Sequence, residues 1–358
     1  MDTGKLDIRL TCVAGRVARV AIANTRPQVA GVLHGLPAAQ ATALVPRLFA
    51  LCGRAQGAAA EAARYAAEGA GLSRRVDRRV AAEAAQEHLW RLLVDWPREL
   101  GLTPLAAAFA RWRRTLAGDP QSLNGAPFLD FLGEDLLGMA PEAWLGMNSR
   151  EHFRDWHFAS PALAALICRQ LADDGEGEAV LPTVAPLQAF DSFSAGTGWP
   201  ALSRAFSEQP VWHGLPAETG AYARRTGDPL IGALSPQPLL ARVAARLREL
   251  AALALNDCAQ PLPGALTALP LGRDRGGSLV ETARGLLMHE LTLEGGKVAR
   301  YVIVAPTEWN FHPDGPLPAL LTGQNCATAL QAAMRARRGV LALDPCVANG
   351  ISVDWQGG

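Results

Sequence analysis

Apolar and polar side chains alternate at the start of the chain, over residues 5–22, where KLDIRLTCV is followed by RVARVAIA. A period of two places every second side chain on the same face, as in a strand with one buried side. Gly15 lies between the two runs, and glycine is typical of a tight turn between paired strands. The pattern therefore predicts an N-terminal β-hairpin.

The central part of the chain follows a helical period instead. Apolar residues recur every three or four positions in stretches rich in Ala, Leu, Arg and Glu, which favour helices. We expect helices over residues 38–69 (broken near Pro46 or Gly53), 75–95, 104–116, 161–172 and 236–256, the last strongly amphipathic. Residues 181–235 are rich in Pro, Gly and Ser and are expected to be irregular.

Alternation returns in the last third, on both sides of Gly295–Gly296, which predicts a second hairpin. A helix is expected at about 323–338. The fold class is therefore α+β and mostly helical, in a single domain over residues 1–358. It comprises the N-terminal hairpin (about 5–22), a helical body (about 38–256) and a C-terminal hairpin and helix (about 277–352).

Composition narrows the choice of partners. The 34 Lys and Arg residues equal the 34 Asp and Glu residues, so charge gives no reason to propose nucleic acid or an anionic membrane as a partner. There is no basic start followed by an apolar run, and no uncharged apolar stretch reaches membrane-spanning length. We expect a cytoplasmic protein whose six cysteines stay reduced.

Three stretches carry residue types that can hold a metal: RLFALCGRAQ (47–56), ETARGLLMHELTLEGGKVARYVIVAPTEWN (281–310) and LDPCVANGIS (343–352). Together they resemble the large subunit of nickel-iron hydrogenases. In that family the first reads R-x-C-G-x-C-P-x-A-H and the last D-P-C-x-x-C-x-x-H. The middle one reads E-A-P-R-G-x-L-x-H, then a glycine turn and P-T-x-W-N. The resemblance implies the large-subunit fold, a long-helix bundle with peripheral β-hairpins.

The departures from the family pattern are as informative as the matches. The family holds nickel and iron with four thiolates in two pairs, and soft sulfur ligands suit such metals. Here each pair is halved, because Phe49 and Asn349 stand where one cysteine of each pair would be. The histidines that close the two motifs are replaced by Gln56 and Ser352. Two cysteines cannot supply a four-thiolate site, so we expect neither hydrogenase catalysis nor nickel.

The retained residues match the iron half of that site. The resemblance implies that Cys52 is an iron ligand and that Cys346, which matches a nickel ligand, could serve iron only in a shifted geometry. It also places Arg284, Pro306 and Thr307 beside the cyanides of an Fe(CN)2CO unit. A buried anionic ligand needs charged or hydroxyl donors, which Arg284 and Thr307 supply. Asp344 matches an aspartate near the metal and could hold Arg284.

The halved motifs resemble the HupK/HoxV group, large-subunit paralogues associated with hydrogenase maturation. That resemblance implies a non-catalytic scaffold that holds or assembles the Fe(CN)2CO unit. The expected partners are chaperones of the HypC/HypD type and the large-subunit precursor. The alternative is a metal-free chaperone that docks the precursor or the maturation chaperones. A third hypothesis is an enzyme with Cys52 as a nucleophile. The sequence gives it little support, because no Cys-His-Asn/Asp arrangement accompanies Cys52.

Structural roles compete with functional ones at several of these positions. Cys52 taken alone reads as a core cysteine, and Arg284 could be an ion-pair partner of Glu281 or Asp344. His289 and His312 are expected to be hydrogen-bonded structural residues. The remaining cysteines match no ligand position and are expected to be core or surface thiols: Cys12, Cys168, Cys258 and Cys326.

Overall fold

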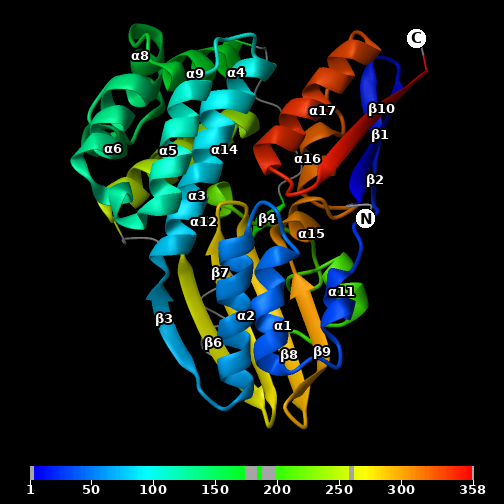
Figure 1. Cartoon of the computed structure of the whole chain (residues 1–358). Coiled ribbons are helices and arrows are strands. Elements are labelled where there is room, and N and C mark those ends of the chain that lie inside the picture. Colours follow the sequence, from blue (N-terminus) through cyan, green and yellow to red (C-terminus); the bar gives the residue numbers. More distant parts are fainter. Residues whose placement is uncertain (1–3, 174–183, 188–198, 258–261, 357–358) are drawn as a thin grey trace.

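The computed structural model describes residues 4–173, 184–187, 199–257 and 262–356. Its elements form three lobes that meet near the middle of the molecule (Figure 1). A helical lobe and a lobe built from both ends of the chain lie side by side above a five-stranded sheet. No helix within the described ranges is both long and apolar enough to span a membrane.

The terminal lobe joins the two ends of the described chain. It consists of β1 (Lys5–Val13), β2 (Arg16–Asn24), α16 (Pro316–Leu321), α17 (Ala329–Leu343) and β10 (Ala348–Gln356). Strands β1 and β2 form the predicted hairpin, with Leu6, Ile8 and Leu10 pointing inward from β1. Strand β10 was not predicted. It pairs in parallel with β1, from Ala348 opposite Lys5 to Gln356 opposite Val13.

The sheet lobe has the strand order β3-β6-β7-β8-β9. Its elements are α1 (Ala38–Leu44), the 3-10 turn Val45–Arg47, α2 (Gly53–Ala67), β3 (Leu72–Val76), β6 (Ala265–Gly272), β7 (Arg275–Thr282), β8 (Gly285–Glu294) and β9 (Lys297–Val304). Strands β8 and β9 are the predicted C-terminal hairpin, which the structure extends into a larger sheet. Helix α2 lies directly on β7: a Cβ at Gly276 would come within 2.2 Å of the Ala67 nitrogen, so only glycine fits there.

The helical lobe is built around one central helix, α14 (Pro238–Leu255). Around it lie α3 (Arg78–Trp90), the π-helical segment Arg91–Asp95, α4 (Trp96–Glu99), α5 (Ala106–Gly118), α6 (Ala126–Phe131), the π-helical segment Leu132–Leu137, α7 (Pro141–Gly146), α8 (Arg150–Ala159), α9 (Leu163–Asp173) and α13 (Pro229–Leu234). The helix predicted over 236–256 is confirmed as α14, but its polar face does not meet solvent, because residues 241–254 are all buried. Its charged side chains are paired inside the protein, as Arg248 is with Asp228 at 2.9 Å.

Several short elements lie within or between the lobes. They are the 3-10 helices Val29–Leu33 and Pro120–Asn124, the two-residue strands β4 (Ala185–Pro186) and β5 (Ala217–Glu218), and the helices α11 (Arg204–Glu208), α12 (Ala221–Arg224) and α15 (Pro306–Asn310). The segment predicted to be irregular thus contains short helices where it is described. Residues 181–183 and 188–198 of that segment, and Cys258, lie outside the described ranges.

Two predicted helix boundaries move for identifiable reasons. The helix expected from residue 75 begins at Arg78, because Leu72–Val76 forms β3 and the Asp77 side chain caps the helix start. The helix expected over 323–338 is α17 instead, which begins after the Thr328 cap and ends at Asp344 in a left-handed conformation. That shift matters for function, because it places Asp344 and Cys346 directly at the end of α17.

Candidate functional site

The two cysteines of the halved motifs come together where the three lobes meet. Cys52 is the N-cap residue of α2, and Cys346 lies in the short loop between α17 and β10. Burial raises the pKa of Cys52 to about 12, and the charge of Cys346 is the second cause. Both are free thiols and partly exposed as residues. From the sequence, only the resemblance implied that these two cysteines are close. In the structure they lie near enough for the charge of Cys346 to affect Cys52.

Thr307 is hydrogen-bonded directly to Cys346. It is the second residue of α15, after the buried Pro306. The Cys346 backbone N–H donates to the Thr307 hydroxyl at 3.2 Å, and the same hydroxyl lies 3.1 Å from the Cys346 sulfur. A hydroxyl that accepts from the backbone can give its own proton to a thiolate. Thr307 therefore fixes the cysteine and can stabilise its negative charge.

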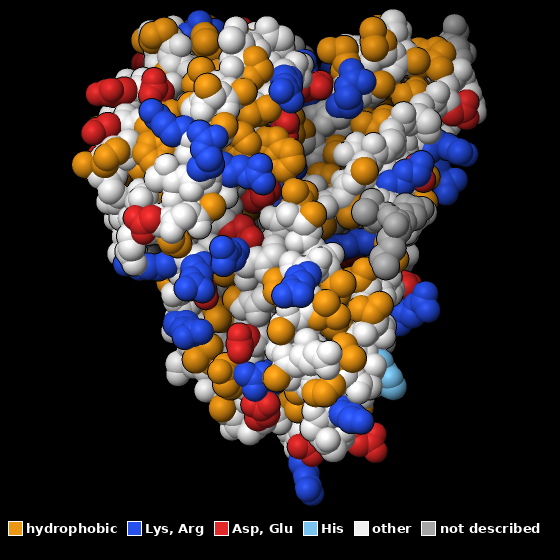
Figure 2. Space-filling model, in the orientation of Figure 1, with side chains coloured by type: hydrophobic (Ala, Val, Ile, Leu, Met, Phe, Trp, Pro, Cys, Tyr) orange, Lys and Arg blue, Asp and Glu red, His pale blue; other side chains and the backbone are white. Residues whose placement is uncertain are grey.

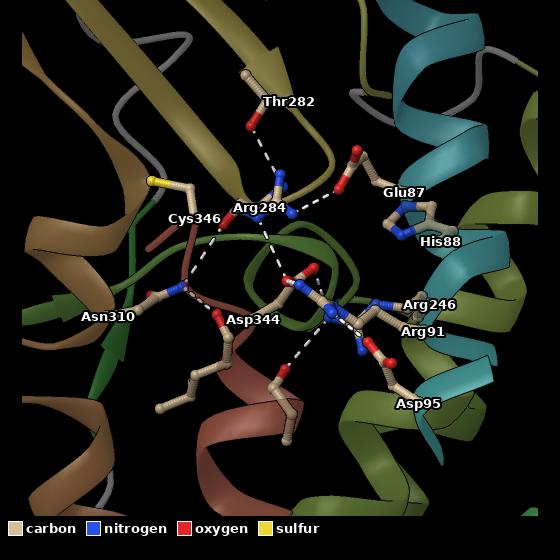
Figure 3. Close-up of polar contacts among 12 residues, drawn as sticks. Glu87, His88, Arg91, Asp95, Arg246, Thr282, Arg284, Asn310, Asp344 and Cys346 are labelled. Carbon is tan, nitrogen blue, oxygen red and sulfur yellow. Dashed lines mark hydrogen bonds and ion pairs between the residues drawn. The ribbon is translucent and has the colours of Figure 1, made fainter. Parts of the chain in front are cut away.

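Asp344 is the buried centre of a group of arginines behind Cys346 (Figure 3). Its side chain is 1% exposed and accepts a hydrogen bond from Arg91 at 2.7 Å. Arg284 and Arg246 lie 3.3 and 3.7 Å from its oxygens. Burial alone would raise the pKa of Asp344, but these three arginines, Arg284 most strongly, hold it below its usual range. The sequence expectation that Asp344 holds Arg284 agrees with this geometry.

Arg284 itself lies in the tight turn between β7 and β8. Its guanidinium also binds Glu87 of α3, and its backbone N–H donates to the Thr282 hydroxyl at 3.2 Å. The charge of Arg284 lowers the pKa of Cys52, and both cysteine sulfurs in turn favour the charged guanidinium. Of the two ion-pair partners considered for Arg284, Asp344 is present, whereas Glu281 binds Arg224.

A chain of neutral hydrogen bonds lies behind Cys52. The Gln56 amide donates to the Cys52 sulfur at 3.8 Å, and its oxygen accepts from His289 at 2.9 Å. The other ring nitrogen of His289 lies 2.9 Å from the Tyr301 hydroxyl. Burial lowers the pKa of His289 to about 3, so the ring stays neutral. His289 is thus a structural residue, as expected, and it orients the residue that replaces the family's first-motif histidine.

Arg26 is a residue of the site that the sequence analysis missed. It follows β2, and its charge lowers the pKa of Cys52. Among the groups that favour its own charged form, the Cys346 sulfur acts more strongly than Glu308, and Cys52 comes third. No local pattern marks Arg26, because it reaches the cysteines only through the packing of the terminal lobe against the sheet.

Two cavities adjoin the site, and each contains one of the replaced positions. Phe49 lines a cavity of about 180 Å³ together with Arg26 and Glu308. Asn349 and Cys346 line a larger one of about 560 Å³, between α17 and the Trp90–Glu99 segment. This second cavity lies in the hollow between the helical and terminal lobes, visible in Figure 2. The positions of the missing thiolates therefore border open space on two sides of the cysteine pair.

The other candidate ligands are not at this site. Cys12, Cys168 and Cys326 are buried in apolar surroundings, as expected of core thiols. His312 is hydrogen-bonded to the backbone N–H of Asp314 at 3.1 Å. Among the residues that the structure describes, no group of three or more His, Cys, Asp or Glu side chains is arranged to hold a bare metal ion.

The fold is similar to that of solved hydrogenase structures. The Ni-Fe-Se hydrogenase from D. vulgaris Hildenborough aligns with a TM-score of 0.58 and 16% identity, over 94% of each chain. The Nickel-dependent hydrogenase family model matches residues 257–352. The chain therefore has the fold of a nickel-iron hydrogenase large subunit, of the α+β class that the sequence predicted.

Closer relatives define the family within that fold. The chain is 34% identical to the hydrogenase expression/formation protein HoxV of Cupriavidus necator, over 96% of this chain and 94% of the relative. It is 31% identical to the protein HupK of Rhizobium leguminosarum bv. viciae, over 99% and 97%. The chain belongs to the HoxV/HupK family of hydrogenase expression/formation proteins, large-subunit paralogues as the motifs indicated.

Proposed function

We propose that this protein is a non-catalytic scaffold in nickel-iron hydrogenase maturation, which holds the Fe(CN)2CO unit before its transfer to the large-subunit precursor. Membership of a family named for hydrogenase expression and formation supports the maturation role. The iron unit is cargo here and not a resident cofactor.

The observation that carries the proposal is the convergence of Cys52, Cys346, Arg284 and Thr307 on one place. Thiolates are soft ligands suited to iron, and the unit brings three diatomic ligands of its own, so it needs few protein ligands. A thiol must lose its proton to bind a metal, and the nearby guanidiniums favour that loss at Cys52. The arginines also provide donors for the anionic cyanides.

The replaced positions favour holding iron without nickel. Phe49 is an apolar ring in one cavity, and Asn349 is a weak, neutral ligand at the edge of the other. Neither supplies the terminal thiolates on which nickel chemistry in the large subunits depends. We therefore propose that the protein binds no nickel and catalyses no hydrogen chemistry.

Transfer by thiolate exchange suits the position of Cys346 beside an open cavity. Cys346 borders the open 560 Å³ cavity, where the thiol of a partner can reach the iron. The bond from iron to the Cys346 sulfur breaks as one to the incoming sulfur forms, and the incoming proton passes to Cys346. In this proposal chaperones of the HypC/HypD type deliver the unit, the large-subunit precursor receives it, and all act in the cytoplasm.

Infrared spectroscopy tests the proposal directly. Protein purified anaerobically from a host with the maturation genes should show stretching bands of bound carbon monoxide and cyanide. Cys52→Ala should lose them, while Cys168→Ala, which removes a thiol far from the site, should keep them. Absence of these bands from the wild type, under conditions that load a known maturation chaperone, would sink the scaffold proposal.

A metal-free docking chaperone is the second candidate, favoured by the loss of half the thiolates and by the wide cavity beside Asn349. In that case the large-subunit precursor should co-purify equally well with the wild type, Cys52→Ala and Cys346→Ala. Loss of the complex in both variants would count against docking independent of metal.

A further inference from the structure

The backbone of Arg26 is held firmly at the point where the terminal lobe meets the sheet. The Asn24 side chain accepts from the Arg26 backbone N–H at 3.0 Å, and Thr25 donates to Lys5 at 2.9 Å. Gly4 packs so tightly there that a Cβ on it would lie 2.5 Å from the Arg26 Cα. The start of β1 thus fixes where this arginine side chain leaves the backbone.

The guanidinium of Arg26 is held by two further groups. Its Nη1 lies 3.3 Å from Glu308, the residue after Thr307, and the side chains of Arg26 and Glu308 are only 13% and 8% exposed. The Phe49 ring lies 5.3 Å from the guanidinium carbon, within cation–π range. Phe49 therefore contributes an aromatic face to Arg26 at the position where the large subunits have a thiolate.

Arg26 and Arg284 approach the cysteines from different elements and line different cavities. Arg26 lines the cavity that contains Phe49, whereas Arg284 lines a small internal space beside Arg246 and Asn310. Each has its own carboxylate partners, Glu308 in one case and Asp344 with Glu87 in the other. Both sulfurs act electrostatically on both guanidiniums. The cysteine pair therefore has two cationic neighbours, each independently supported.

The Thr307 hydroxyl is not free to serve the cargo in the same way. It accepts from the Cys346 backbone and lies 3.1 Å from the Cys346 sulfur, so its single proton can be used at that sulfur. An iron unit with two anionic cyanides in a largely desolvated place needs a donor for each of them. Arg284 can serve one, and a second donor is required.

We propose that Arg26 is a positioning residue for the iron unit, whose guanidinium donates to one cyanide while Arg284 donates to the other. The inference rests on the proposed function and adds the residue that orients the second cyanide. Phe49 and Glu308 hold Arg26 in place for this task. The protein then recognises its cargo by the two anionic cyanide ligands, through one arginine for each cyanide.

Infrared spectra of loaded variants test this assignment. In Arg26→Met the separation of the two coupled cyanide bands should change, because only one cyanide loses a donor. At limiting supply the loaded fraction should fall roughly tenfold, as expected for a lost hydrogen bond to a charged group. Arg26→Lys keeps the charge and should retain most of the loading. Phe49→Leu, which leaves Arg26 in place without its aromatic face, should change that separation by less.

The control is Arg19→Met. Arg19 is an exposed arginine on β2, the strand that precedes Arg26, and its replacement should change neither the bands nor the loading. If the wild type shows both cyanide bands and the spectrum and loading of Arg26→Met superimpose on them, the role of Arg26 is refuted and the scaffold function stands. If both cyanide bands of Arg26→Met shift equally, Arg26 acts only on overall structure and the assignment is also refuted. Absence of any bands from the wild type refutes the scaffold function and this inference together.

Discussion

The molecule contains two pairs of cysteines that come together from distant parts of the chain, and their surroundings are opposite in character. The sulfurs of Cys12 and Cys326 lie 3.8 Å apart, and the residues are 1% and 2% exposed in the apolar core of the terminal lobe. Cys52 and Cys346 are partly exposed and have arginines and a threonine hydroxyl around them. Cys346 of this second pair borders the cavity of about 560 Å³.

The difference teaches that proximity of two thiols does not make a metal site. Burial, the hydrogen bond to Cys326 and the charges of Cys326 and Asp354 all raise the pKa of Cys12, to about 11. Burial and Cys346 raise the pKa of Cys52 as well, but Arg284 and Arg26 oppose them. The pKa of Cys52, at about 12, is no lower than that of Cys12, so the candidate site differs from the core pair in having cations that can stabilise a bound thiolate and not in a lower pKa.

The largest expected effect is on stability, when the aspartates near the two cysteine pairs are replaced one at a time. Asp344→Asn leaves Arg91, Arg246 and Arg284 buried without their shared counter-charge, and should lower the free energy of unfolding by about 3–5 kcal/mol. Asp354→Asn, beside Cys12 on the exposed side of β10, should change it by less than about 0.5 kcal/mol. Urea unfolding curves of both variants measure the difference. Equal midpoints would show that the arginine cluster does not depend on Asp344.

We expect the stability of the protein to depend on pH through a buried carboxyl group near Cys52. Glu83 accepts from the Arg54 and Ala55 backbone N–H groups just after Cys52, and burial raises its pKa from 4.5 to about 7. The folded state therefore binds a proton that the unfolded state has lost between these values, so stability falls as pH rises from 4.5 to 7. The contribution is on the order of 3 kcal/mol.

Comparison of unfolding free energies at pH 5 and pH 7.5 in wild type and Glu83→Gln measures this contribution. The variant should lose that part of the pH dependence, whereas Glu61→Gln, exposed on α2, should keep it. Identical pH profiles for wild type and Glu83→Gln would contradict the raised pKa.

The smallest expected effect is a difference in reactivity between the pairs. Cys346 borders an open cavity, whereas Cys12 and Cys326 become accessible only when the terminal lobe opens. Under anaerobic, reducing conditions iodoacetamide should label Cys346 at least about tenfold faster than either of them. Mass spectrometry of timed samples measures the rates, and protein unfolded in guanidinium should label all three equally. A Cys12 rate close to that of Cys346 would mean that the terminal lobe opens readily.

Local order along the chain was determined by the sequence alone. Both hairpins, the break between α1 and α2 and the long helices α5 and α14 follow from hydrophobic period and turn residues, which act over a few neighbours. The identities of Cys52, Arg284, Thr307 and Cys346 were also readable, because each lies in a motif of adjacent residues. The halved motifs already argued against a four-thiolate site.

Which residues come into contact with one another was decided only by the tertiary structure. The parallel pairing of β1 with β10 joins opposite ends of the chain, and no local pattern encodes a partner so distant. The burial of α14 on all sides depends on the helices packed around it, which convert an amphipathic pattern into internal ion pairs. Arg26 reaches the cysteines only because the terminal lobe docks on the sheet. Charges act through space, so the electrostatic character of the site exists only once these lobes are assembled.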